Sequence, residues 1–160
     1  VRNDLQVVST DHCSFCMSAK GGQIGKELGK KDFSKIPNGA PGIETRMMLL
    51  WEGVSAGRIT PQHFVDITST TPAKLFGLYP RKGAVMPGAD ADLLLLDPKK
   101  KTKLAAKTLH MNVDYNPYEG RSVPCFIRDV FVRGEQMVKG GKFVGRLSHG
   151  RFVRRAPRMN

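Results

Sequence analysis

The chain has 160 residues, of which 40% are hydrophobic and 25% are charged, a composition typical of a folded domain and not of a disordered segment. It holds no run of about 18 apolar residues, so we expect no membrane-spanning helix. The formal net charge of +12 lies mainly in residues 83–160, which hold 15 Lys or Arg and 7 Asp or Glu. Because the chain lacks a nucleic-acid motif with aromatic residues among the basic ones, this charge favours a solvated tail, or an arm on an acidic neighbour, over nucleic-acid binding.

Three cysteines, Cys13, Cys16 and Cys125, are present. An odd number with irregular spacing does not describe a disulfide framework, so a reducing, cytoplasmic setting is expected. The first eight residues are too polar for a signal peptide. Because position 1 is not methionine, we expect the sequence to open inside a longer protein.

The first half of the chain alternates between loop and helix signals. Residues 5–10 form an apolar run that ends in polar residues, which predicts a buried strand with Asp11 at its carboxyl end. Residues 13–43 show little periodicity and predict a long loop, a feature that is often functional. Residues 44–56 carry a single apolar stripe at helical spacing and predict a helix.

Two Thr-Pro pairs predict further helix starts in this half. Thr60-Pro61 supplies an N-cap and a first-turn proline, and Thr71-Pro72 repeats the signal. Gly77 is expected to close the second of these helices.

After Gly83 the pattern changes to short strands separated by glycine and proline. Residues 91–97 contain four consecutive leucines before a proline, which favours a strand. Residues 126–133 alternate apolar and polar side chains, and turns at 133–135 and at Gly140-Gly141 predict a hairpin. The sequence therefore predicts an α/β chain with a boundary near residues 82 and 83.

No complete catalytic centre is visible in the residue spacing. The chain has four well-separated histidines without the spacing of metal ligands: His12, His63, His110 and His149. The CSFC motif at residues 13–16 is formally C-x-x-C, but it lacks both the further ligands of a zinc site and the helix of a thioredoxin-like unit. A nucleophile elbow and a phosphate-binding loop are also absent.

Asp11 is the strongest candidate for chemistry. An acidic residue at the end of an apolar strand, followed by His12 and a long polar loop, is typical of a site at the mouth of a barrel. A carboxylate in such a place can bind a metal and take a proton from water. The alternative is an aspartate that caps the next turn, and the spacing alone does not decide between the two.

Several short motifs follow one another along nearly the whole chain. They are STDHC at residues 9–13, DF at 32–33, IPNGAPGIETRM at 36–47, TTPAK at 70–74, FGLYPRKG at 76–83, GADADL at 88–93, NPYEG at 116–120 and GRLSHGRFVRR at 145–155. Each motif is weak alone, but together and in this order they are specific. With them the chain resembles the carboxy-terminal part of the dihydropyrimidinase/hydantoinase family of metal-dependent cyclic amidohydrolases.

The resemblance implies a fold, a distorted (β/α)8 barrel with a small β-sandwich domain. Residues 1–82 would form the last strand and helices of the barrel, and residues 83–160 the carboxy-terminal part of the β-sandwich domain with an oligomerisation tail. In relatives this tail packs against a neighbouring subunit, which implies a homo-oligomer, namely a tetramer.

The resemblance also implies a reaction, the hydrolytic opening of cyclic amides such as hydantoins and dihydropyrimidines. Two divalent metal ions, usually zinc, share a hydroxide and a carboxylated lysine in this family. Asp11 matches the aspartate that binds one metal and accepts the hydroxide proton, and Asn38 matches the asparagine whose backbone bonds the ring amide. The remaining ligands of the family lie outside this chain, so we expect the isolated chain to be inactive.

Three other assignments stay open from the sequence. One is the non-catalytic scaffold branch of the same family, which keeps the fold without the metal site. Another is a different cyclic amidohydrolase, an allantoinase or a dihydroorotase. The last is a basic nucleic-acid-binding module, which rests on the net charge alone.

Overall fold

The computed structural model describes residues 4–156. The chain forms two compact units. The first, called the sheet unit, contains residues 4–8, 50–101 and 124–156, and the second, called the loop unit, contains residues 9–49 and 102–123. Within residues 4–156, no helix is both long enough and apolar enough to cross a membrane.

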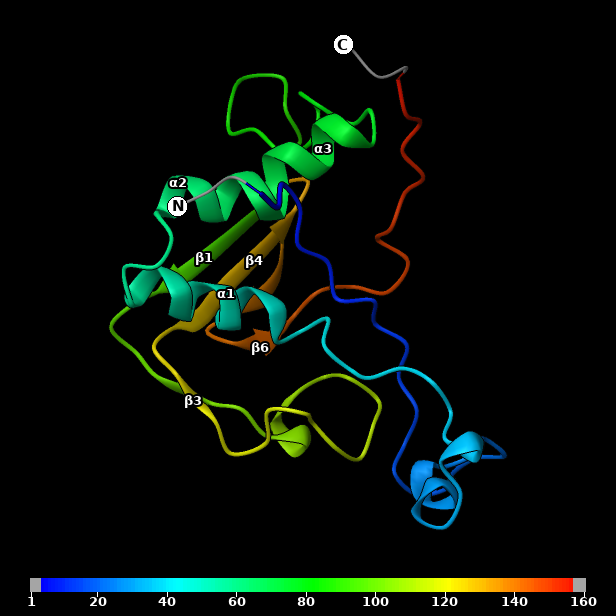
Figure 1. The fold of residues 1–160 in the computed structure, drawn as a ribbon. Coiled ribbons are helices and arrows are strands. Elements are labelled where there is room, and N and C mark those ends of the chain that lie inside the picture. The colour runs from blue at the N-terminus through cyan, green and yellow to red at the C-terminus, as the bar shows by residue number, and fades with distance from the viewer. Residues whose placement is uncertain (1–3, 157–160) are drawn as a thin grey trace. The chain divides into compact units, whose positions relative to one another are not determined.

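An antiparallel sheet of four strands forms the centre of the sheet unit (Figure 1). Its order is β1-β4-β5-β6, with β1 at Leu93–Asp97, β4 at Phe126–Val132, β5 at Glu135–Lys139 and β6 at Lys142–Phe143. The strand predicted at 91–97 and the hairpin predicted after residue 126 are therefore confirmed. A bulge between Leu95 and Leu96 shifts the register of β1 on β4.

The two hairpin turns follow from residues that accept positive backbone φ angles. Arg133 and Gly134, between β4 and β5, have φ of 49° and 79°. Gly140 and Gly141, between β5 and β6, have φ of 58° and 80°. Two consecutive positive φ angles are those of a type I′ turn, whose twist matches that of antiparallel strands.

Helix α1, at Arg46–Ser55, confirms the helix predicted at 44–56. It begins in the loop unit and ends in the sheet unit. Gly57, at φ 68°, donates its N–H to Val54 O at 2.9 Å and ends the helix.

Helix α2, at Pro61–Val65, starts at the predicted cap: the Thr60 side chain accepts the His63 N–H at 3.1 Å. Its buried Phe64 meets Trp51 edge to face, with ring centroids 5.4 Å apart. The helical backbone then continues through a π-helical segment, η3 at Asp66–Thr70, into α3 at Thr71–Leu75.

Helix α3 begins at the second Thr-Pro pair with Pro72 in its first turn, as predicted, but no side-chain hydrogen bond caps its start. The Thr71 N–H bonds to Asp66 O, so the chain is already helical before Pro72. Pro72 cannot donate an N–H, and the wider π turn ahead of it changes the hydrogen-bond register at that point. Gly77, at φ 67°, ends α3 as predicted.

The strand predicted at residues 5–10 is absent from the structure. Leu5 is 73% exposed, and the Val8 N–H donates to Ile67 O at 3.1 Å without a ladder forming. A buried parallel strand needs hydrogen-bonding neighbours along its length, and residues 4–156 do not supply them here.

The loop unit consists mainly of irregular chain, as predicted for residues 13–43. Its short elements are η1 at Lys26–Lys30, η2 at Phe33–Lys35, η4 at Ala106–Thr108, and the antiparallel pair β2 (Thr102–Lys103) and β3 (Ser122–Val123). Leu104, Val123 and Thr45 are fully buried in it. The predicted α/β class is confirmed, and the boundary between residues 82 and 83 stays a prediction.

Candidate active-site segments

Asp11 lies exposed in the loop unit with a left-handed backbone, φ 46°. Aspartate adopts the left-handed conformation more readily than most residues. The conformation still costs energy, and residues that adopt it occur preferentially at functional positions. Within residues 4–156, no group donates a hydrogen bond to its carboxylate, so Asp11 does not cap a turn among them. With respect to the described part of the chain, the Asp11 side chain is therefore free to act on a ligand.

The backbone next to Asp11 runs beside the segment that contains Asn38. His12 and Ala40 form a parallel bridge, and the Cys13 N–H donates to Ala40 O at 3.4 Å. Gly39, at φ 123°, comes so close that a Cβ on it would lie 2.1 Å from Cys13 O. The structure thus brings the two predicted site segments together, although they are far apart in the sequence.

The His12 ring ties these segments together a second time. Its Nδ1 faces the backbone N–H of Gly42 at 3.1 Å and that of Ile43 at 3.4 Å. Gly42 O in turn accepts the Thr45 hydroxyl at 3.2 Å, and Thr45 is fully buried. The segment 38–43 is therefore fixed at its carboxyl end by one buried and one half-buried side chain.

Asn38 and Gly39 are exposed, whereas Pro37 before them is half-buried. The Lys26 ammonium donates to Pro37 O at 2.6 Å and holds the amino end of the segment. Proline on both sides of the turn, at 37 and 41, restricts the backbone. Asn38 and Asp11 are consequently both exposed on adjoining segments with fixed backbones.

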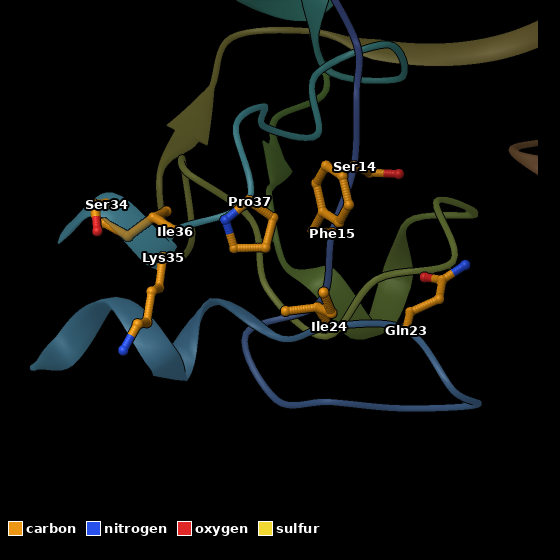
Figure 2. A pocket seen from close by; sticks show the side chains of 8 residues that line it. All are labelled: Ser14, Phe15, Gln23, Ile24, Ser34, Lys35, Ile36 and Pro37. Carbon is orange, nitrogen blue, oxygen red and sulfur yellow. The ribbon is translucent and has the colours of Figure 1, made fainter. Parts of the chain in front are cut away.

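A hollow of about 430 Å³ opens beside Pro37 within the loop unit (Figure 2). Its lining is mainly apolar: Phe15, Ile24, Ile36 and Pro37, with Ser14, Gln23, Ser34 and Lys35. Figure 2 shows the Phe15 ring close to Pro37 and Ile24, whereas the Lys35 ammonium points away from that ring.

Two carboxylates connect the residues around 110 to the site segments. The Asp114 carboxylate accepts the N–H of Met17 at 2.6 Å and of Ser18 at 3.2 Å, and these backbone hydrogen bonds lower the pKa of Asp114. Glu44 accepts the His110 N–H at 2.5 Å, and its other oxygen lies 2.7 Å from His110 Nδ1. Both contacts join parts of the chain more than 60 residues apart.

A metal centre is not complete in the described residues. Among residues 4–156, no group of three or more His, Cys, Asp or Glu could hold a metal ion. The carboxylate of Asp11 fits one hard-oxygen ligand position, so a complete metal centre would need ligands from beyond residues 4–156. Cys13 and Cys16 are free thiols, and the C-x-x-C motif forms neither a disulfide nor a metal site among these residues.

The family model described as "Amidohydrolase family" matches residues 2–137 of the chain. A D-hydantoinase of Streptomyces coelicolor is 50% identical over 96% of the chain, and a D-phenylhydantoinase of Escherichia coli is 45% identical over the same share. The dihydropyrimidinase structure from Brevibacillus agri superposes on 98% of the chain with a TM-score of 0.91 and 48% identity. A D-hydantoinase structure from Thermus sp. gives a TM-score of 0.88 at 45% identity over 96% of the chain.

The chain therefore belongs to the amidohydrolase family and, within it, to the group of D-hydantoinases and dihydropyrimidinases. It spans about a third of the length of the relatives that it matches: 32% of the Streptomyces coelicolor protein and 33% of the Brevibacillus agri chain.

Sequence reasoning missed the residues that hold the candidate site in place. The sequence marks His12 only as the neighbour of Asp11, and its partner Gly42 lies 30 positions away. The partners of Asp114 and Glu44 lie at even larger sequence separations. No spacing rule connects such positions, and the place of His12 directly after Asp11 is the one signal in the sequence that points to it.

Proposed function

We propose that this chain is the carboxy-terminal third of a metal-dependent hydrolase that opens cyclic amides of the hydantoin and dihydropyrimidine kind. In this proposal it contributes the last strand and helices of a (β/α)8 barrel and part of a small β-sandwich domain. The names of the relatives support the substrate class. They favour it over an allantoinase or a dihydroorotase.

Asp11 is the catalytic residue in this proposal and one of the metal ligands. When bound, two divalent metal ions, zinc in the first place, would supply Lewis acidity that makes water acidic enough to provide a nucleophile at neutral pH and polarises an amide carbonyl. The Asp11 carboxylate takes the proton of the attacking water and passes it to the leaving ring nitrogen. The Asp11 carboxylate is exposed and accepts no hydrogen bond from residues 4–156, so both of its oxygens are available to bind a metal ion and to accept a proton.

Asn38 binds the substrate through its backbone. A cyclic amide offers one N–H and one C=O on adjacent ring atoms, and a fixed peptide group can pair with them. The segment is held by Lys26 on one side and by the His12 ring on the other. Such fixed donors and acceptors orient a substrate without a further loss of backbone entropy on binding.

The observation that carries the proposal is the adjoining position of the two segments. Asp11 and Asn38 are separated by 26 residues, yet the His12–Ala40 bridge and the Cys13–Ala40 hydrogen bond place their backbones side by side. Hydrolysis of a bound ring requires the group that activates the nucleophile to lie close to the group that orients the substrate.

A chimera tests the proposal directly. This chain is substituted for the matching segment of the Streptomyces coelicolor D-hydantoinase, and hydantoin hydrolysis is measured with zinc present. We expect the chimera to hydrolyse hydantoin and the isolated 160-residue chain to be inactive. Zinc-dependent hydrolysis by the isolated chain, or an inactive but folded chimera, would contradict the proposal.

The partners in this proposal are a small cyclic amide and further copies of the full-length protein in a tetramer. The basic segment that begins at Arg146 would contact a neighbouring subunit, and its last four residues, 157–160, lie outside the described part. A full-length protein lacking residues 146–160 is expected to show a smaller mass in light scattering. A reducing, cytoplasmic location stays a prediction.

A further inference from the structure

The His12 side chain makes an unusual connection between the two candidate site segments. Its Nδ1 is the acceptor for two successive backbone N–H groups, those of Gly42 at 3.1 Å and Ile43 at 3.4 Å. The same residue forms the parallel bridge to Ala40 through its backbone. His12 thus contacts the Asn38 segment twice while it directly follows Asp11 in the chain.

The direction of these hydrogen bonds fixes the tautomer of the ring. Both Gly42 and Ile43 present N–H donors, so Nδ1 must offer its lone pair and the proton of the neutral ring must lie on Nε2. A proton on Nδ1 would face two other protons and break both contacts. An asparagine at this position could place its Oδ1 where Nδ1 lies, whereas leucine could not accept either N–H.

Few other contacts hold this part of the loop unit close to Asp11. The hydrogen bond from Cys13 N–H to Ala40 O is long, at 3.4 Å. Gly39 approaches Cys13 without a hydrogen bond between them in the described residues. The half-buried His12 ring is therefore the side chain best placed to set the separation between the Asp11 and Asn38 segments.

We propose that His12 is a positioning residue for the hydrolysis, which holds the ring-binding segment 38–43 at a fixed distance from the Asp11 carboxylate. The role rests on the proposed function of Asp11 and Asn38. His12 contacts neither the substrate nor the reacting atoms in this proposal. It acts through the peptide groups of Gly42 and Ile43 alone.

Nuclear magnetic resonance on the intact 160-residue chain tests the contact itself. An N–H···N hydrogen bond transmits a measurable scalar coupling between its two nitrogens, so we expect a coupling from the Gly42 amide nitrogen to His12 Nδ1. The same spectra should show the ring proton on Nε2. A folded chain with the proton on Nδ1, or without the coupling, would overturn the proposal.

Kinetics of the chimera test the role. A loss of alignment of about 1 Å can cost on the order of 100-fold in rate, so His12→Leu should lower kcat/KM for hydantoin about 100-fold and raise KM. His12→Asn, which keeps the acceptor, should stay within about tenfold of the parent. Loss of stability alone would reduce the amount of active enzyme and leave KM unchanged.

The two sets of results separate the role of His12 from the function of the site. Equal losses in His12→Asn and His12→Leu, or full activity in His12→Leu, would contradict the positioning role. A chimera that hydrolyses hydantoin at the parental rate after Asp11→Asn would instead contradict the proposed function. The coupling between Gly42 and His12 needs no activity and decides the contact in either case.

Discussion

Gly39 offers the sharpest single test of how tightly the two site segments fit together. Its φ of 123° lies in a region that side-chain-bearing residues rarely adopt. A Cβ there would lie 2.1 Å from Cys13 O and 2.8 Å from Cys13 Cβ. Because carbon and oxygen do not approach closer than about 3 Å, Gly39→Ala must push the segments apart by about 1 Å.

The expected cost has two parts. In the left-handed region the backbone strain costs an alanine roughly 1–2 kcal/mol, for which Gly22→Ala is the control, and at the φ of 123° at Gly39 the strain is at least as large. Gly22 has φ 80° in the same unit, and a Cβ added to it would meet no other atom within 4 Å. The displacement at Gly39 adds a loss of substrate alignment, for which about 100-fold in kcat/KM is the appropriate scale.

Hydantoin hydrolysis by the chimera, followed with thermal unfolding of each variant, separates the two parts. We expect Gly39→Ala to lose about 100-fold in kcat/KM and Gly22→Ala to stay within about threefold of the parent, since its cost falls on stability alone. Full activity in a folded Gly39→Ala chimera would refute the view that the close approach of these segments sets the site.

Three further outcomes follow from side chains outside the reaction. Phe64 is 6% exposed against Trp51, so Phe64→Ala should lower the free energy of unfolding in urea by about 3–5 kcal/mol, and a loss below about 1 kcal/mol would contradict its place in the core. Burial raises the pKa of the Cys125 thiol to about 11. Iodoacetamide at about pH 8 should therefore alkylate the exposed Cys13 and spare Cys125 until urea is added. Labelling of Cys125 in the folded chain would contradict this prediction. The pKa of Asp114 lies below its ordinary value of 3.8. The amide chemical shifts of Met17 and Ser18, which donate to this carboxylate, should therefore stay constant above that pH and change as the pH falls through the lowered pKa. Asp114→Asn should remove this acid-dependent change.

The elements that could be predicted from the sequence are those whose cause is local. Thr60 caps α2 because its hydroxyl reaches an N–H three residues on, and glycine at 134 and 141 ends strands because the turn needs a positive φ. Thr71-Pro72 likewise marks the first turn of α3, but the sequence does not show that a π-helical segment leads directly into it.

The parts that could not be predicted depend on distant partners. The run at residues 5–10 has the composition of a buried strand, but a strand is defined by its neighbours, and Leu5 is exposed here. The residue type and position of Asp11 mark it as a candidate, whereas the Gly42 N–H that donates to His12 lies 30 residues away. Only the family resemblance marks Asn38, because an exposed asparagine has no physical property that distinguishes it in a sequence.

The most direct test of the account is the Asp11→Asn chimera compared with its parent. Asparagine tolerates the left-handed φ of 46° as well as aspartate does, so the backbone and stability should be preserved while the negative charge and the proton acceptor are lost. We predict that folded, zinc-loaded Asp11→Asn has at most about one thousandth of the parental kcat/KM for hydantoin, on the scale of a lost general base and ligand together. Hydrolysis at the parental rate would contradict the assignment of Asp11 as the catalytic carboxylate.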